Sequence, residues 1–123
     1  MKNQKFSMRK TVTSFVYAFN GLKILLREEP NSRIHLVASI CTIIAGILLK
    51  VSLNEWIALV LAMGFVITLE IVNSAIENIA DFISPGRDDM IKKVKDLSAA
   101  GVLVSAITAL IIGLIVFLPK IIR

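Results

Sequence analysis

The chain has 123 residues, 56% of them hydrophobic and 19% charged, and a formal net charge of +5. This apolar share exceeds the roughly 45–50% of an ordinary soluble domain, so most of the surface is expected to face lipid, and the length indicates a single domain, 1–123. Nucleic-acid binding is excluded as the reason for the positive charge, because the basic residues lie beside apolar segments and are not interleaved with exposed aromatic side chains.

Residues 1–33 are expected to form a cytoplasmic surface helix followed by an elbow. From about Thr11 to Arg27, apolar side chains recur at helical spacing with basic and polar residues between them. Pro30 disfavours helix at Glu29 and readily starts a new one. The pattern therefore predicts two helices that change direction near Pro30.

Three later segments are apolar enough to cross a membrane, and the fold class predicted is all-α with three transmembrane helices. The segments are residues 34–50, 55–83 and 97–118. Trp56 is expected to anchor the second span at the outer interface. That span is longer than the hydrocarbon needs, so its last turns are expected to emerge into the cytoplasm.

Short polar stretches separate the spans. Lys50 to Asn54 reads as an outer turn, and 84–96 reads as a cytoplasmic loop with the start of the third helix. Pro119 is expected to end that helix.

The basic residues predict the orientation of the chain in the membrane. Eleven Lys and Arg residues precede the first span or lie between the second and third, whereas three lie elsewhere. The positive-inside rule therefore places the N-terminus in the cytoplasm and the C-terminus outside.

Two single residues have ordinary interpretations. Cys41, the lone cysteine, is expected to be a small buried hydrophobe, since free cysteine is among the most buried residue types. His35, the lone histidine, is expected to lie at the interface or to cap a helix, because no second histidine exists to complete a typical metal site.

One face of the second span carries the candidate chemistry. On a helical wheel these polar residues fall within about 100° of one another, opposite an apolar face. They are Glu70, Asn73, Ser74, Glu77 and Asp81. If the hydrocarbon begins near Trp56, Glu70 lies about 7–8 Å inside the membrane and Glu77 near its inner boundary.

Acids gathered at one membrane boundary repel one another unless a cation joins them. The elbow adds Glu28 and Glu29 at the same boundary, and the third helix adds Lys95 and Asp96. A hard divalent ion such as Mg²⁺, held by carboxylates and phosphate oxygens, would relieve this repulsion.

Two classes of protein that are not enzymes also fit these residues. A small oligomeric ion-coupled transporter also uses intramembrane carboxylates, although it would place them near the bilayer midplane. A non-catalytic helical scaffold would bind no nucleotide.

The motif E-x-x-N-S-A-I-E-x-x-x-D at 70–81, followed by Lys95-Asp96, resembles the prokaryotic diacylglycerol kinase family. This family of small three-span membrane kinases includes the undecaprenol kinases of Gram-positive bacteria. The resemblance extends from Tyr17-Ala-Phe-Asn-Gly-Leu22 to Phe117-Leu-Pro119. It implies a homotrimer with active sites shared between subunits, which transfers the γ-phosphoryl group of Mg-ATP to a lipid hydroxyl.

The resemblance also implies residue roles. Glu70 would be the general base and Asn73 would position the reacting groups. Glu77 and Glu29 would bind Mg²⁺, with Glu28 as the alternative at the elbow. The expected ATP-binding residues are Lys95, Asp96, Glu77, Glu29, Tyr17 and Asp81, where Tyr17 would lie beside the base and Asp81 would be nucleotide-side or structural.

The expected partners are ATP, membrane lipids, a lipid alcohol and further copies of the chain. The short chain and the Phe-Leu-Pro-Lys ending look like the Gram-positive branch, which favours undecaprenol as acceptor over diacylglycerol.

Overall fold

The computed structural model describes residues 7–122, and four helices account for nearly all of them. They are α1 (Met8–Glu28), α2 (Pro30–Leu48), α3 (Leu53–Ile83) and α4 (Asp89–Ile122). The last three are long and apolar enough to cross a membrane. The all-α prediction with three candidate spans is therefore confirmed.

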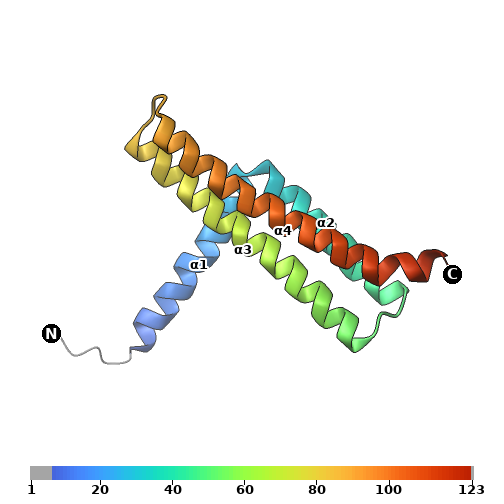
Figure 1. Cartoon of the computed structure of the whole chain (residues 1–123). Coiled ribbons are helices and arrows are strands. Elements are labelled where there is room, and N and C mark those ends of the chain that lie inside the picture. The colour runs from blue at the N-terminus through green and yellow to red at the C-terminus, as the bar shows by residue number, and fades with distance from the viewer. Residues whose placement is uncertain (1–6, 123) are drawn as a thin grey trace.

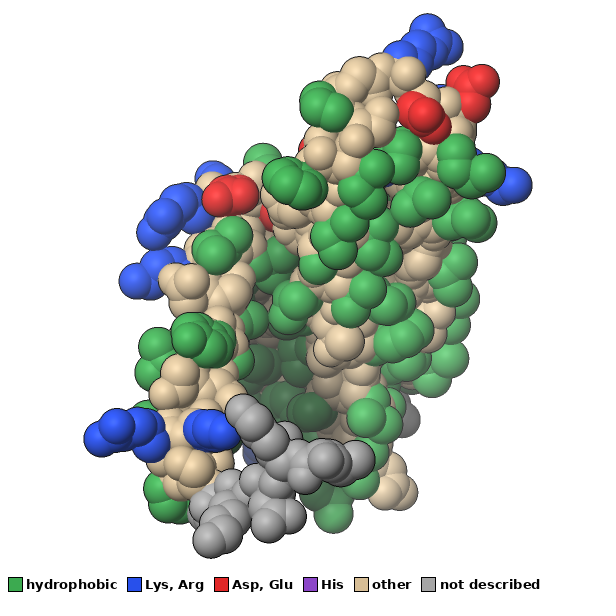
Figure 2. Space-filling view, turned by 90° about the vertical axis from the view of Figure 1, so that its left-hand side faces the viewer, with side chains coloured by type: hydrophobic (Ala, Val, Ile, Leu, Met, Phe, Trp, Pro, Cys, Tyr) green, Lys and Arg blue, Asp and Glu red, His purple; other side chains and the backbone are tan. Residues whose placement is uncertain are grey.

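The four helices form a bundle of three with one helix projecting from it (Figure 1). α3 and α4 lie side by side along most of their length, α2 packs chiefly on α3, and α1 extends away at a steep angle. The 84–88 connection and the C-terminus lie at opposite ends of the bundle. Hydrophobic side chains cover a broad band of the surface, whereas charged ones gather along α1 and at one end (Figure 2).

The elbow between α1 and α2 is a single residue, Glu29, in an extended conformation. Pro30 occupies the first turn of α2, where its missing N–H costs no helical hydrogen bond. The Arg33 guanidinium donates to the carbonyl oxygens of Leu26 (2.7 Å) and Arg27 (2.8 Å). These bonds satisfy carbonyls that the end of α1 would otherwise leave unpaired, and they fix the elbow.

The small core of the chain lies at the end where α2 turns into α3. Val51, Leu59 and Val116 are buried there, with Trp56 packed against them. Ser52 and Glu55 form a capping box that starts α3, and Lys120 pairs with Glu55 at 3.0 Å. This end is thus closed within one chain.

Two expectations about single residues are wrong. α4 continues through Pro119 to Ile122, because proline fits helical φ, and the Lys120–Glu55 pair ties this last turn to α3. Cys41 is exposed, since α2 packs mainly on α3 and leaves its opposite face uncovered in the single chain.

The ring of Trp56 packs on Gly46 of α2. A Cβ added at Gly46 would lie 2.6 Å from Cη2 of Trp56. We expect Gly46→Ala to lower stability by about 1–3 kcal/mol, the usual cost of overpacking. Thermal unfolding in detergent, followed by the fluorescence of this single tryptophan, measures the effect.

Gly64→Ala is the matched control for this variant. An added Cβ at Gly64 in α3 meets nothing within 4 Å, so this change should be neutral or raise helix stability by up to about 1 kcal/mol. Equal unfolding temperatures for the Gly46→Ala variant and the unmodified chain would contradict the proposed packing.

Candidate active site

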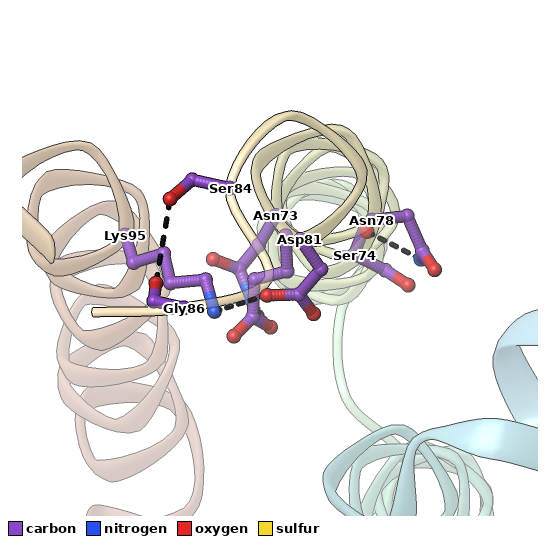
Figure 3. A network of polar contacts seen from close by, with 8 residues as sticks. Asn73, Ser74, Asn78, Asp81, Ser84, Gly86 and Lys95 are labelled. Atoms are coloured by element: carbon purple, nitrogen blue, oxygen red, sulfur yellow. Dashed lines mark hydrogen bonds and ion pairs between the residues drawn. The ribbon is translucent and has the colours of Figure 1, made fainter. Parts of the chain in front are cut away.

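The polar face of α3 lies between two neighbours. Ser74 and Asn78 lie on one side of the helix, and Asn73 and Asp81 lie on the side of Lys95 in α4 (Figure 3). Ser74 bonds to the elbow, and Asp81 bonds to α4. The predicted polar face of α3 therefore exists, but its side chains contact two different neighbours, the elbow and α4.

Glu70 is buried against α2, with 5% of its surface exposed. The Ser32 hydroxyl donates to its Oε2 at 3.4 Å, and His35 Nε2 lies 3.0 Å from its Oε1. The His35 contact has the distance of an ion pair without the alignment of a hydrogen bond, so Oε1 has no hydrogen-bond donor among the described residues. Burial of an unsatisfied carboxylate oxygen is costly, which is typical of functional sites.

An apolar groove ends at this carboxylate. Its volume is about 200 Å³, and it lies where α1, α2 and α3 meet. The lining residues are Leu22, Leu25, Leu26, Ser32, His35, Leu36, Ile67 and Glu70. Glu70 is thus the acid that faces an apolar space.

The elbow acid that contacts α3 is Glu29. The Ser74 hydroxyl donates to its Oε1 at 3.2 Å, and its side chain is half-buried. Glu28 is the last residue of α1 and is exposed. Of the two alternatives at the elbow, the geometry brings Glu29 to the polar face.

Asn73 connects Glu77 to α4. Its Nδ2 donates to Glu77 Oε2 at 3.2 Å, and its Oδ1 accepts from the Ser98 hydroxyl at 2.6 Å. Because the hydroxyl occupies Oδ1, the amide N–H₂ is directed toward Glu77. This chain of bonds holds the Glu77 carboxylate from one side.

Lys95 and Asp81 form an exposed ion pair between α4 and α3. The hydrogen bond that Lys95 donates to Asp81, with the charges of Asp81 and Glu77, raises the pKa of Lys95 above its ordinary value despite some desolvation. Lys95 therefore stays cationic at physiological pH. An exposed pair of this kind stabilises a fold little, so this cation is available to an anionic ligand.

The other predicted residues lie outside these contacts. Asp96 pairs with Lys92 at 2.6 Å within α4. The Tyr17 side chain is 71% exposed on α1, and no hydrogen bond joins it to another residue of the described part. Within one chain, Glu70 and Ser74 therefore contact α2 and the elbow, whereas Asn73 and Asp81 contact α4.

Within residues 7–122, no three acidic, histidine or cysteine side chains cluster closely enough to hold a metal by themselves. Mg²⁺, however, usually takes only one or two carboxylates and completes its shell with phosphate oxygens and water. Glu29 and Glu77 each use one carboxylate oxygen for a protein hydrogen bond and have the other to offer. The donor set fits a metal that arrives with a phosphate ligand.

Sequence reasoning missed Ser32, His35 and Ser98 as site residues. His35 lies in the second turn of α2, not at its cap, and it contacts Glu70. Ser32 and His35 are three residues apart and so share a helix face, a spacing that could have signalled a common partner. Ser98 carried no such signal, because its contact depends on the register between α3 and α4.

Similarity to known proteins identifies the family of this chain. Residues 16–117 match the family described as prokaryotic diacylglycerol kinase. The chain belongs to this family. It is 35% identical to the undecaprenol kinase of Bacillus subtilis over 119 residues, which cover 97% of each chain.

Other relatives in the family are named diacylglycerol kinases. The chain is 32% identical to a diacylglycerol kinase of Synechocystis over 109 residues, which are 88% of this chain and 62% of that protein. It is 27% identical to the diacylglycerol kinase of Escherichia coli K12 over 111 residues, which are 90% and 91% of the two chains. Membership of this family favours a kinase over the transporter and the scaffold.

Proposed function

We propose that this protein is a lipid kinase, which transfers the γ-phosphoryl group of Mg-ATP to the hydroxyl of a membrane lipid alcohol, with undecaprenol as the acceptor. The observation that carries the proposal is the buried Glu70 carboxylate in the wall of an apolar groove, with one oxygen that has no hydrogen-bond donor among residues 7–122. An alcohol on an apolar chain matches both features.

Glu70 acts as the general base in this proposal. The acceptor's hydrocarbon lies along the leucines of α1, and its hydroxyl donates to Glu70 Oε1. Glu70 removes the proton as the hydroxyl oxygen attacks phosphorus. The groove excludes water, so the phosphoryl group meets the lipid hydroxyl in preference to a water molecule.

The nucleotide lies on the more polar part of the face. Glu29 and Glu77 hold Mg²⁺, and Asn73 orients Glu77 and the reacting groups. When bound, the ion neutralises charge on the phosphates. Lys95 contributes a second positive charge, Asp81 holds the Lys95 ammonium group, and Asp96 completes the nucleotide region of α4.

We further propose a homotrimer that shares its sites between subunits. In one chain, Tyr17 and many apolar side chains of α2 and α4 are exposed, and α1 projects from the bundle (Figure 1). Neighbouring copies would cover these faces, and Tyr17 would reach a partner's site. The excess of basic residues places the N-terminus and the 84–96 segment in the cytoplasm, where ATP is available, and the C-terminus outside.

A direct assay tests the activity. Purified protein in detergent is incubated with γ-labelled ATP, Mg²⁺ and either undecaprenol or diacylglycerol, and label is expected in the lipid fraction with undecaprenol. Faster labelling of diacylglycerol would identify diacylglycerol as the acceptor. The family description and the name of the Synechocystis relative favour this second candidate. Absence of label with both lipids would contradict the kinase proposal.

A further inference from the structure

We infer that His35 is the proton acceptor of Glu70, so that the proton taken from the lipid hydroxyl leaves the buried site through the imidazole. The inference rests on the proposed role of Glu70 as base. It gives His35 a positioning and proton-accepting role that acts through Glu70, without contact between His35 and the reacting phosphorus.

The need for such a residue follows from the burial of Glu70. After each transfer Glu70 is protonated, and it must lose that proton before it can act again. Its side chain is only 6% exposed, and the leucines and isoleucine that line the groove cannot accept a proton. Without a second acceptor, regeneration of the base would depend on water entering an apolar groove.

His35 has the geometry to accept this proton. Its Nε2 lies 3.0 Å from Glu70 Oε1, the oxygen that has no hydrogen-bond donor among the described residues. The other oxygen, Oε2, is held by Ser32, so the carboxylate is oriented with Oε1 toward the imidazole. The distance between these two atoms lies within the range over which a proton passes between two groups.

His35 is less buried than Glu70 and lies between two grooves. Its side chain is 27% exposed, and it lines both the groove beside α1 and a second apolar groove of about 410 Å³ between α2, α3 and α4. It is thus part of the wall between the two spaces. Glu70 itself lines only the first.

No competing ionic group of the described residues faces this pair. α1 presents only leucines to it, α3 presents Glu70, and α4 presents apolar residues across the second groove. On α2 and the elbow, Arg33 is bonded to the carbonyls at the end of α1, and Glu29 is bonded to Ser74.

The proton and electron balance is complete. The hydroxyl oxygen of the lipid forms a bond to the γ-phosphorus, the bond from that phosphorus to the bridging oxygen breaks, and ADP keeps the electron pair. The hydroxyl proton passes to Glu70 and then from Oε1 to Nε2 of His35. The imidazolium finally releases a proton to cytoplasmic water, which restores the starting pair.

The test compares steady-state kinetics of the full-length protein with Mg-ATP and undecaprenol from about pH 5.5 to 8.5, the range in which imidazole titrates. With intact His35, kcat should rise with pH as the imidazole becomes neutral and able to accept. His35→Gln keeps an N–H near the same place but cannot titrate. We expect its kcat to fall by roughly tenfold to a hundredfold with KM for ATP little changed, and this pH-dependent rise to disappear.

Chemical rescue gives a second, independent readout. Imidazole added to the buffer should raise the kcat of His35→Ala several-fold, because the truncated side chain leaves space beside the 410 Å³ groove. The same imidazole should not restore Glu70→Gln. A positioning residue without a proton-accepting role would not produce this pattern.

Ser39→Ala is the matched control, since Ser39 lies one turn along α2 and lines the same groove without touching Glu70. It should keep the pH profile of the unmodified protein. An unchanged kcat and pH profile in His35→Gln, together with an inactive Glu70→Gln, would overturn the inference about His35 and leave the proposed role of Glu70 as base intact. Full activity in Glu70→Gln would instead overturn the proposed base.

Discussion

Replacement of Glu70 by glutamine is expected to abolish turnover while leaving the affinity for Mg-ATP nearly unchanged. Glutamine has the same shape and can still accept the hydrogen bond from Ser32, but it cannot take a proton. Loss of a general base lowers rates by about 10² to 10⁴-fold. The change should therefore appear in kcat, measured by transfer of label to undecaprenol.

Nucleotide binding must be measured on the same preparation. Equilibrium binding of a fluorescent ATP analogue in the presence of Mg²⁺ separates the two roles that an acid can have here. Glu28→Gln is the control, because Glu28 is exposed at the end of α1 and should alter neither kcat nor Kd. Loss of nucleotide binding in Glu70→Gln would place Glu70 among the metal ligands and would contradict its assignment as the base.

Local sequence patterns were enough to predict the helices. Apolar periodicity predicted the surface helix and three spans, and Pro30 predicted the elbow that the structure places at Glu29. These features depend on residues close together in the chain. The end of α4 was predicted wrongly because a tertiary contact, Lys120 with Glu55, holds the turn that follows Pro119.

The site could be predicted only in part. Helical spacing correctly placed Glu70 and Glu77 on one face of α3, because that is a property of one helix. The partners of that face come from other helices, so spacing could not show that Glu70 meets His35 while Asn73 meets Ser98. Cys41 failed for the same reason, since burial depends on which faces of α2 its neighbours cover.

The contacts of the polar face of α3 fall into two groups. The contacts of Glu70 are with α2 and an apolar groove, whereas those of Asn73 and Glu77 continue toward α4. Glu29 bonds to Ser74, whose position in the sequence lies between Glu70 and Glu77. The elbow therefore contacts α3 between the residue proposed as the base and a residue proposed as a metal ligand.

The second large effect is expected at Glu77 and Glu29, whose replacement by glutamine should weaken Mg-ATP binding. Each glutamine can still accept the present hydrogen bond, from Asn73 or from Ser74, so the fold should be retained while a negative charge is lost. Removal of a residue that only hydrogen-bonds to a metal ligand lowers metal affinity by about 10 to 100-fold. We therefore expect the loss of a direct ligand to raise the Kd for Mg-ATP by at least about tenfold. Titration of Mg²⁺ at fixed ATP analogue measures this for each variant, with Glu28→Gln again as control.

The double variant shows whether the two acids hold one ion. If Glu29 and Glu77 share a single Mg²⁺, removal of the second acid should add less than its separate effect, because the shared ion is already weakly held. Additive losses would indicate two independent sites. Unaltered Mg-ATP binding in Glu77→Gln would remove Glu77 from the metal site, and the acids at the cytoplasmic end of α3 would then need another explanation than phosphoryl transfer.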